Sequence, residues 1–406
     1  MDVPTSHKSH TTERRFGSLL FLLRMGGVAV NMKPQSTTHV LYKAYLELCY
    51  YATFLSVFMD CLQKTDDLKE SMKKVRLLFA FGYVSWIHLS LSFNKVEIEY
   101  LLKFTENFTW EDIPARDPES GRVTMAGRVQ LVQTGAKYVA ICMVVFHGIQ
   151  SFVHMWQNHD MVFTTWYPFD VSNSPVYELI NIAQFSAFVL VTGVFAGFQG
   201  LYAILVCVAC SQLEKLRANL SSSGAEIATP DQDSGDNPES DPGPDKIQEQ
   251  LNDCIRHHQI TQLYMQELEK SLSSALGGLF FCLLAAMCFV SFSVVTSWGD
   301  HNDVSQALVM YVCMMSNVFV FCWLGSELSD QAQRVRDAAW NSNWVGSPVR
   351  FQRCLVFIIA SANKEFKLTA GKYVPMANKT TLNMMNQTIS FFMFLLHMKR
   401  KTEETI

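Results

Sequence analysis

The sequence lacks the short motifs by which many enzymes are recognised. It contains no Walker-type phosphate loop, no HExxH pair and no GxSxG turn, and its 11 histidines are scattered along the chain. Catalysis needs several chemically active groups within reach of one another. We therefore expect a protein that is not an enzyme and that needs no cofactor and no metal.

Cysteines are absent from the segments that we predict to face outward, so no disulfide framework is expected. The 11 cysteines are Cys49, Cys61, Cys142, Cys207, Cys210, Cys254, Cys282, Cys288, Cys313, Cys322 and Cys354. Cys207 and Cys210 have the spacing of a CxxC motif, but they lie in an apolar run. In such a run cysteine behaves as a small hydrophobic residue, so we expect the two to pack and not to bind metal.

The apolar residues are bunched into long runs, which an average over the chain conceals. Hydrophobic residues make up 49% of the 406 positions, and the mean hydropathy is only +0.11. A run of about 20 apolar residues can cross the ~30 Å hydrocarbon core of a membrane as a helix. Seven such runs are present, at residues 40–61, 75–93, 138–156, 179–209, 276–298, 304–323 and 374–398. The sequence therefore predicts an all-α membrane protein with seven transmembrane helices.

Lysine and arginine are missing from two short segments between these runs, 159–174 and 299–303. Basic residues favour the cytoplasmic side of a membrane, most strongly in short loops. The N-terminal arm and segments 94–137, 211–270 and 326–372 hold most of the 33 lysines and arginines. We therefore expect a cytoplasmic N-terminus and an extracellular C-terminus, the inverse of a G-protein-coupled receptor.

The predicted spans divide the chain into membrane parts and cytoplasmic parts. An apolar run flanked by arginines near the N-terminus predicts a helix lying on the inner membrane surface. The predicted parts are a cytoplasmic arm (1–37), transmembrane helices one to four on the ligand-binding side (38–210), a cytoplasmic loop with an anchor helix (211–275), helices five and six (276–325), a cytoplasmic anchor (326–372), a pore-lining seventh helix (373–399) and an extracellular tail (400–406).

The cytoplasmic loop combines a disordered segment with a helix. Residues 221–245 are rich in Pro, Gly, Ser and acidic residues and contain no aromatics. Such a composition cannot bury enough apolar surface to become ordered. Helical periodicity resumes at Ile247 and continues into the fifth span, and apolar periodicity also follows the sixth span. Helices with one apolar side need partners, so we expect a cytoplasmic helical anchor domain.

The outer halves of the second, third, fourth and sixth spans share aromatic and methionine side chains with few polar tips. A cavity lined in this way suits a small, mostly apolar, volatile ligand. The candidate ligand contacts are Phe79, Tyr83, Met143, Phe146, His147, Gln150, Tyr177, Asn181, Gln184, Phe185, Phe188, Met310, Tyr311 and Met314. Each taken alone also fits an ordinary bundle core. Tyr83, His147 and Gln150 stand out, because a buried polar tip needs a partner.

The last span is unusually polar for a membrane helix. It carries Lys379, Asn383, Asn386, Gln387 and Ser390 among its apolar residues. Polar groups facing lipid are costly, so these side chains should face water or other protein. A pore-lining helix and a bundle helix joined by polar contacts both satisfy this condition.

Several segments together resemble the insect odorant receptor family. The outer segments 166–170 (WYPFD) and 174–179 (SPVYEL) look like the approach to that family's fourth span, and the cytoplasmic 251–258 (LNDCIRHH) is similar to its fifth-helix motif. The most specific part is the closing 368–375 (LTAGKYVP) with 390–392 (SFF). The further motifs are 321–328 (FCWLGSEL) and 338–344 (AAWNSNW). The resemblance extends from about residue 36 onward. A tyrosine is frequent in the family at the position of Phe391, and the TYxxxxxQF ending of the related gustatory receptors is absent.

The resemblance implies a tetrameric, odorant-gated, non-selective cation channel with an inner N-terminus. Its partners would be a small volatile odorant, membrane lipid and the shared co-receptor subunit, with which it forms a heterotetramer, and no nucleic acid. It would lie in the plasma membrane of olfactory sensory neurons as a multi-pass protein. The final helix lines the pore in that family, and positions matching Phe394 and Met398 form its narrow apolar ring, which can block ions by dewetting. The candidate pore and gate residues are Gln387, Ser390, Phe391, Phe394, His397 and Met398.

Other functions remain open on the sequence alone. The co-receptor is longer than this chain and lacks a tail such as 400–406, which favours the ligand-tuning subunit over the co-receptor itself. The alternative from another class is a G-protein-coupled seven-helix chemoreceptor, which would have the opposite orientation. A secondary transporter would show internal repeats or paired charges within the membrane, and neither is evident.

Overall fold

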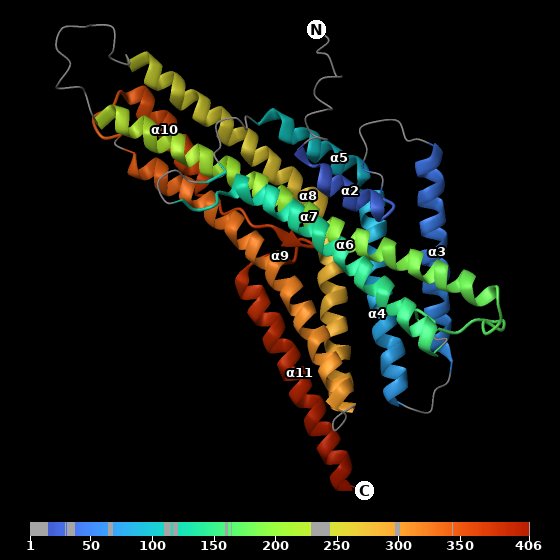
Figure 1. Ribbon diagram of the computed structural model, residues 1–406. Coiled ribbons are helices and arrows are strands. Elements are labelled where there is room, and N and C mark those ends of the chain that lie inside the picture. Colours follow the sequence, from blue (N-terminus) through green and yellow to red (C-terminus); the bar gives the residue numbers. More distant parts are fainter. Residues whose placement is uncertain are drawn as a thin grey trace.

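The structure is a computed structural model, and it is almost entirely helical (Figure 1). The residues that it describes are 15–28, 30, 37–63, 68–108, 115–116, 121–158, 161–163, 165–228, 244–296, 301–342 and 344–405. The elements in chain order are α2 (Gly17–Met25), α3 (Thr37–Leu62), α4 (Leu68–Phe93), α5 (Lys95–Phe104), the short 3-10 helix η1 (Thr105–Asn107), α6 (Met125–Asn158), α7 (Val176–Ala228), α8 (Pro244–Thr296), α9 (His301–Asn341), α10 (Val349–Ala362), β1 (Thr369–Ala370), β2 (Val374–Pro375) and α11 (Asn378–Thr405).

Helix α7 is the centre of the bundle, and α2, α3, α4, α6, α8 and α9 all pack against it. Residues 201–210 of α7 are apolar on every side, and each of them is buried. A helix that is hydrophobic all round needs neighbours all round. Cys207 and Cys210 are both within this stretch and 1% exposed. The structure therefore places the CxxC pair in the packed core.

Most of each of the seven predicted spans lies on a long helix, namely α3, α4, α6, α7, α8, α9 and α11. Five described helices, α4, α6, α7, α8 and α9, are long and apolar enough to cross a membrane. Helices α3 and α11 are not among these five; they have 26 and 28 residues, so they are about 40 Å long, and α11 is the more polar of the two. Helices α7 and α8 have 53 residues each, about 80 Å, so both extend far beyond one span.

The N-terminal helix α2 packs into the bundle through its apolar side. Leu19 and Leu23 are fully buried, and α2 contacts α6 and α7. The sequence predicted a helix lying on the membrane surface, but this side is covered by protein and is not available to lipid. Gly193 and Gly197 of α7, which have the spacing of a GxxxG motif, face Gly26 and Leu23. A Cβ at Gly26 would lie 2.6 Å from the backbone nitrogen of Val194, so the two backbones touch.

Replacing Gly193 with alanine should therefore destabilise the fold, since the added methyl would collide with the backbone of Gly26. We expect a loss of about 1–3 kcal/mol, as for other overpacked sites, seen as a lower melting temperature in detergent. Gly200 is the matched control on the same helix. A Cβ there would meet Leu19 at 3.6 Å, an ordinary contact, so Gly200→Ala should change the melting temperature little. Equal effects of the two substitutions would contradict this packing.

The far ends of the long helices form a second packed region, which we call the α10 bundle (residues 211–228 of α7, 244–275 of α8, 326–341 of α9, and α10). It lies at the upper left of Figure 1. Tyr264 is fully buried and donates to the carbonyl of Leu205 at 3.2 Å. Gln262 and Ser361 join α8 to α10 at 2.8 Å. The predicted apolar helix sides thus pack on one another within the chain.

A buried histidine in the α10 bundle is held neutral. Nε2 of His257 lies 3.0 Å from Oε1 of Gln212. Burial lowers the pKa of His257 to about 4, and the nearby charge of Lys215 adds to that effect. A neutral ring protonated on Nε2 donates to Gln212, so α7 and α8 are joined by a neutral hydrogen bond at neutral pH.

Three boundary predictions were wrong. Helix α7 continues to Ala228 and α8 begins at Pro244, so both edges of the segment predicted as disordered are helical; residues 229–243 lie outside the described residues. Extending an existing helix is easier than nucleating one, which explains the overrun. For the same reason α11 continues to Thr405, through most of the predicted tail. The seventh helix also begins at Asn378, later than predicted, because residues 369–375 form a hairpin.

This hairpin fixes the start of α11 against α8 and α9. Thr369 pairs with Pro375, and Gly371 and Lys372 turn the chain with positive φ angles of 64°. The backbone N–H of Gly371 donates to the carbonyl of Ser273 at 2.7 Å, and that of Thr369 donates to Glu269 at 2.8 Å. A positive φ is unusual for lysine, so the turn is held by these contacts.

Candidate functional site

The predicted ligand region contains an aromatic cluster centred on His147 of α6. Its ring centroid lies 3.8 Å from that of Phe188 on α7 and 6.0 Å from that of Phe163. Phe163 in turn meets Phe81 of α4 edge-on at 5.6 Å. Three helices and the segment after α6 therefore converge on this point. Sequence reasoning predicted His147 and Phe188 but missed Phe163, because that segment was treated as an outer loop.

Two amides of α7 hold this outer segment in place. Gln184, which is 0% exposed, accepts from the N–H of Phe163 at 2.8 Å and donates to the carbonyl of the same residue at 3.1 Å. Its Nε2 also lies 3.1 Å from the hydroxyl of Tyr167. Asn181 accepts from the N–H of Val162 at 3.0 Å. Both amides were predicted as ligand contacts, but Gln184 and Oδ1 of Asn181 bond to the segment, which we call the outer plug (residues 161–163 and 165–167). Nδ2 of Asn181 donates to the carbonyl of Tyr177 on its own helix.

Two other predicted residues carry buried polar atoms without a hydrogen-bond partner in the described part of the chain. They are the hydroxyl of Tyr83 and Nε2 of His147. The ring of Tyr83 lies 6.0 Å from that of Phe195, and Phe195 follows Phe188 by two helical turns on α7. Both unpaired atoms thus lie beside one face of α7. Buried polar groups are normally paired, so each of these atoms could receive a hydrogen bond from a ligand.

The structure separates several of the other predicted contacts from this region. Phe146 of α6 is 69% exposed, and Met143 and Gln150 are also exposed, because only the side of α6 with His147 faces α7. The ring of Phe79 is tilted against that of Phe289 on α8, with the centroids 4.6 Å apart. The half-buried contacts Phe185, Met310 and Met314 lie on α7 and α9. The assignment of these residues to a ligand site remains a prediction.

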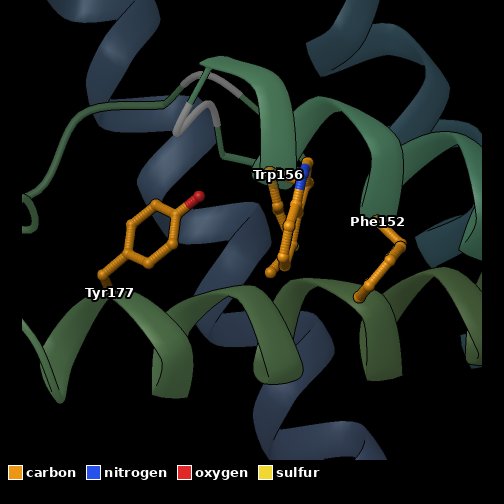
Figure 2. A pocket seen from close by; sticks show the side chains of 4 residues that line it. Phe152, Trp156 and Tyr177 are labelled. Atoms are coloured by element: carbon orange, nitrogen blue, oxygen red, sulfur yellow. The ribbon is translucent and has the colours of Figure 1, made fainter.

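Tyr177 lines a pocket between the outer ends of α6 and α7 (Figure 2). The pocket has a volume of about 360 Å³, and Phe152, Met155 and Trp156 form its other side. In Figure 2 the ring of Trp156 points from α6 toward α7, next to Tyr177. This apolar pocket is separate from the cluster around His147, and sequence reasoning missed its α6 wall.

Helix α11 packs through one face only. Thr381, Met384 and Thr388 are buried at helical spacing against α8 and α9. The predicted pore and gate residues lie on another face and are exposed in the single chain: Gln387, Ser390, Phe391, Phe394, His397 and Met398. A face that carries both large apolar and polar side chains is left for other partners. Gln387 also lines a groove of about 910 Å³ with Trp86 and residues of α8.

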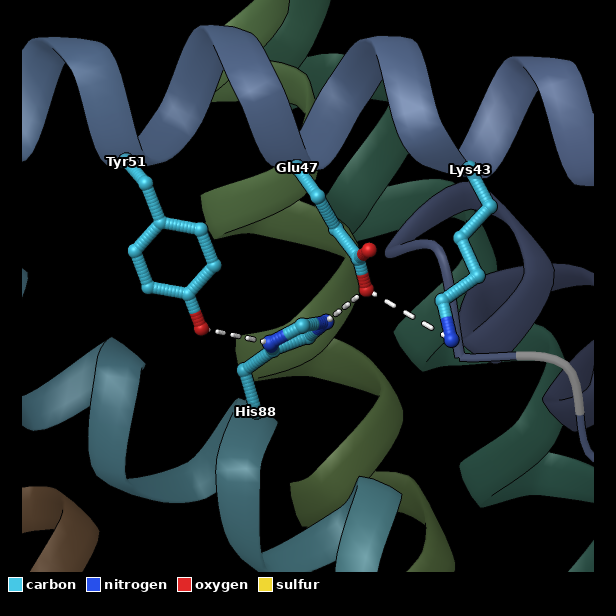
Figure 3. Close-up of polar contacts among 4 residues, drawn as sticks. All are labelled: Lys43, Glu47, Tyr51 and His88. Atoms are coloured by element: carbon cyan, nitrogen blue, oxygen red, sulfur yellow. Dashed lines mark hydrogen bonds and ion pairs between the residues drawn. The ribbon is translucent and has the colours of Figure 1, made fainter.

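A polar network joins α3 to α4 within the predicted first two spans (Figure 3). His88 is 2% exposed; its Nδ1 lies 3.2 Å from the hydroxyl of Tyr51, and its Nε2 lies 3.3 Å from Glu47. Glu47 also pairs with Lys43 at 3.5 Å. Tyr51 donates to Nδ1 of the neutral ring, whereas Nε2 faces the Glu47 carboxylate without a hydrogen bond among the described residues. Lys43 and Glu47 meet across one helical turn within the predicted first span.

The network does not resemble a metal centre. Across the described ranges, no group of three or more His, Cys, Asp or Glu side chains is placed to hold a metal ion. Lys43, Glu47 and Tyr51 follow each other at four-residue spacing on α3, so they share one face. Tyr51 and Glu47 contact His88, and Lys43 pairs with Glu47, so the four residues partner polar groups that would otherwise be costly in a membrane. We interpret the network as a joint between α3 and α4.

Comparisons with known proteins agree on one family. A family model described as 7tm Odorant receptor matches residues 85–389. Among similar curated proteins, Odorant receptor 2a of Drosophila melanogaster is 27% identical over 157 residues, which cover 38% of this chain and 40% of that protein. Odorant receptor 83a of the same species is 22% identical over 291 residues, covering 62% of this chain and 63% of that one. The matched region spans less than two thirds of each of these relatives.

The fold also matches solved structures. The insect olfactory receptor OR5 from Machilis hrabei in complex with eugenol aligns with a TM-score of 0.69 and 15% identity, covering 96% of this chain and 99% of that one. A second structure of OR5 aligns with a TM-score of 0.68 and 14% identity. The chain therefore shares the helical membrane fold of these receptors.

Proposed function

Because the chain belongs to the 7tm Odorant receptor family, whose model covers residues 85–389, we propose that it is the odorant-binding subunit of a heteromeric, ligand-gated cation channel. It is a multi-pass membrane protein of a receptor family and not an enzyme. The proposal includes the shared co-receptor as partner in a tetramer and the plasma membrane of olfactory sensory neurons as location. It also includes an inner N-terminus and an outer C-terminus, with the α10 bundle in the cytoplasm as the anchor.

The observation that carries the proposal is the pair of unpaired polar atoms beside α7, on Tyr83 and His147. They lie among aromatic side chains, where a mostly apolar molecule with one or two polar atoms finds both dispersion contacts and a hydrogen bond. An odorant is such a molecule, and a related receptor of the same fold has been solved in complex with eugenol. The odorant would favour the open state through stronger binding to it.

The proposal is tested by expressing the chain with a co-receptor in oocytes and applying a panel of volatile compounds under voltage clamp. Odorant-evoked cation current that needs both subunits is the expected result. A chain that responds to no member of a broad panel while present at the cell surface would contradict it. Epitope tags at the two ends, probed on intact cells, test the orientation, and an exposed N-terminus would contradict the proposed topology.

Removing the hydroxyl of Tyr83 should separate ligand binding from stability. Tyr83→Phe deletes a buried polar atom that has no partner, so the melting temperature without odorant should stay the same or rise. The potency of odorants with a hydrogen-bonding group should fall about fivefold, which corresponds to the ~1 kcal/mol of one hydrogen bond. The potency of odorants without such a group serves as the control. A uniform loss for both kinds of odorant would contradict a direct contact.

A further inference from the structure

Helix α11 is fixed at its base by contacts to two other helices. The hairpin before it is bound along one face of α8, at Glu269, Ser273 and Gly277, which follow each other by four residues. On α9, the hydroxyl of Ser326 accepts from the N–H of Asn378 at 2.9 Å and so caps the first turn of α11. The base of α11 therefore cannot shift without breaking several hydrogen bonds.

Farther along, a hydrogen bond between side chains joins α11 to α9. The hydroxyl of Tyr311 lies 2.8 Å from Oγ1 of Thr388, and Thr388 is 1% exposed. Oγ1 of Thr388 also lies 2.9 Å from the carbonyls of Met384 and Met385. The one hydroxyl hydrogen of Thr388 is taken by its own helix, so Tyr311 is the donor in this bond.

Beyond Thr388 the packing of α11 loosens. Ile389, Met393, Phe394 and Met398 are each between 48% and 59% exposed. Figure 1 shows this part of α11 running alongside α9 toward the C-terminus. The proposed gate residues Phe394 and Met398 thus follow on α11 after the contact between Tyr311 and Thr388. A change in the position of α9 reaches them through Thr388.

We propose that the hydrogen bond from Tyr311 to Thr388 couples the odorant-binding helices to the pore helix, so that Tyr311 is a positioning residue for the gate and not a ligand contact. The inference rests on the proposed channel function. Helix α9 packs on α7, which carries the aromatic cluster and the amides that hold the outer plug. Helix α9 therefore lies between that region and α11. With the base of α11 fixed, the Tyr311 contact sets the direction of the part beyond Thr388.

The test is a double-mutant cycle measured on the co-expressed channel. Tyr311→Phe removes the donor alone, and Thr388→Val removes the acceptor with little change in shape. We expect each single variant to shift the odorant concentration for half-maximal current by about fivefold, the equivalent of one hydrogen bond. The double variant should shift it no further than the larger single one. Thr388→Ser keeps the hydroxyl and should behave like the wild type.

The pattern of responses across different odorants distinguishes coupling from ligand contact. A coupling residue changes the response to every odorant by the same factor, whereas a contact residue alters their rank order. Tyr45→Phe is the matched control, because the Tyr45 hydroxyl joins α3 to α7 through Ser186 at 3.0 Å and does not touch α11. Its odorant responses should stay unchanged. Additive single effects, a changed rank order or an inert Tyr311→Phe would each overturn the inference, whereas a wild-type chain without current would overturn the proposed function itself.

Discussion

Replacing Phe394 with serine should produce a channel that conducts without odorant. The side chain is 59% exposed in the single chain, on the face of α11 that we assign to the pore. An apolar ring from several subunits blocks ions by dewetting, and a hydroxyl at this position would let water remain. We expect basal current per surface channel to rise at least about tenfold. Such a rise requires the free energy of the closed state relative to the open state to change by only about 1.4 kcal/mol. Hydrophobic burial of one phenylalanine side chain contributes about 1.5–3 kcal/mol, so its loss is large enough to produce this rise in current.

Met393 provides the control for this substitution on the same helix. Its side chain is 57% exposed, close to the 59% of Phe394. It lies one residue earlier, however, and so points about 100° away around the helix. Met393→Ser changes the same amount of apolar surface without reaching the proposed ring. Its basal current should equal that of the wild type. Equal basal currents for the two variants, after correction for surface expression, would remove Phe394 from the gate.

The long helices were predictable from the sequence because their signal is local. A run of about 20 apolar residues reports a membrane span wherever it occurs. The close approach at Gly193 was predictable for a similar reason, since two small residues four apart leave a groove on one helix face. What filled that groove, Gly26 after α2, could not be predicted, because it depends on a segment far away in the chain.

The direction of side chains was the part that the sequence could not provide. The predicted span on α6 is apolar nearly all round, so its sequence does not show which side faces α7, where His147 lies, and which side is exposed, where Phe146 lies. The same ambiguity hid the role of Tyr311, which the structure turns toward Thr388 of α11. In amphipathic helices the polar face removes this ambiguity, but in membrane helices both lipid and protein favour apolar side chains.

The polar residues inside the predicted spans indicate that other parts of the chain or a ligand must contact them. A buried amide needs up to four hydrogen bonds, so Gln184 in an apolar helix had to meet either a ligand or another part of the chain. The structure shows the second case, with the outer plug as the partner. The segment that supplies it contains no lysine or arginine. The lack of basic residues was interpreted as a sign that the segment faces outward. It is equally compatible with a segment that packs back into the helix bundle.

The hydrogen bonds of Gln184 to Phe163 are the strongest reason to treat the outer plug as part of the odorant site. They bind both backbone groups of Phe163 from a side chain that is 0% exposed. They also fix the ring of that residue between His147 and Phe81. From the other side, the hydroxyl of Ser56 on α3 bonds to Thr165 at 3.1 Å. The outer plug therefore covers the cluster around His147.

Replacing Gln184 with leucine should consequently release the outer plug and lower odorant sensitivity strongly. The two backbone groups of Phe163 would lose their partners, at about 1–3 kcal/mol for each buried group left unpaired. We expect at least a tenfold loss of potency, since ~1.4 kcal/mol suffices for that factor, and faster cleavage of the segment by added protease. Gln130→Leu makes the same chemical change at an exposed position of α6 and should alter neither measurement. Unchanged potency in Gln184→Leu channels whose outer plug is cleaved faster would show that the segment holds the fold together but does not shape the odorant site.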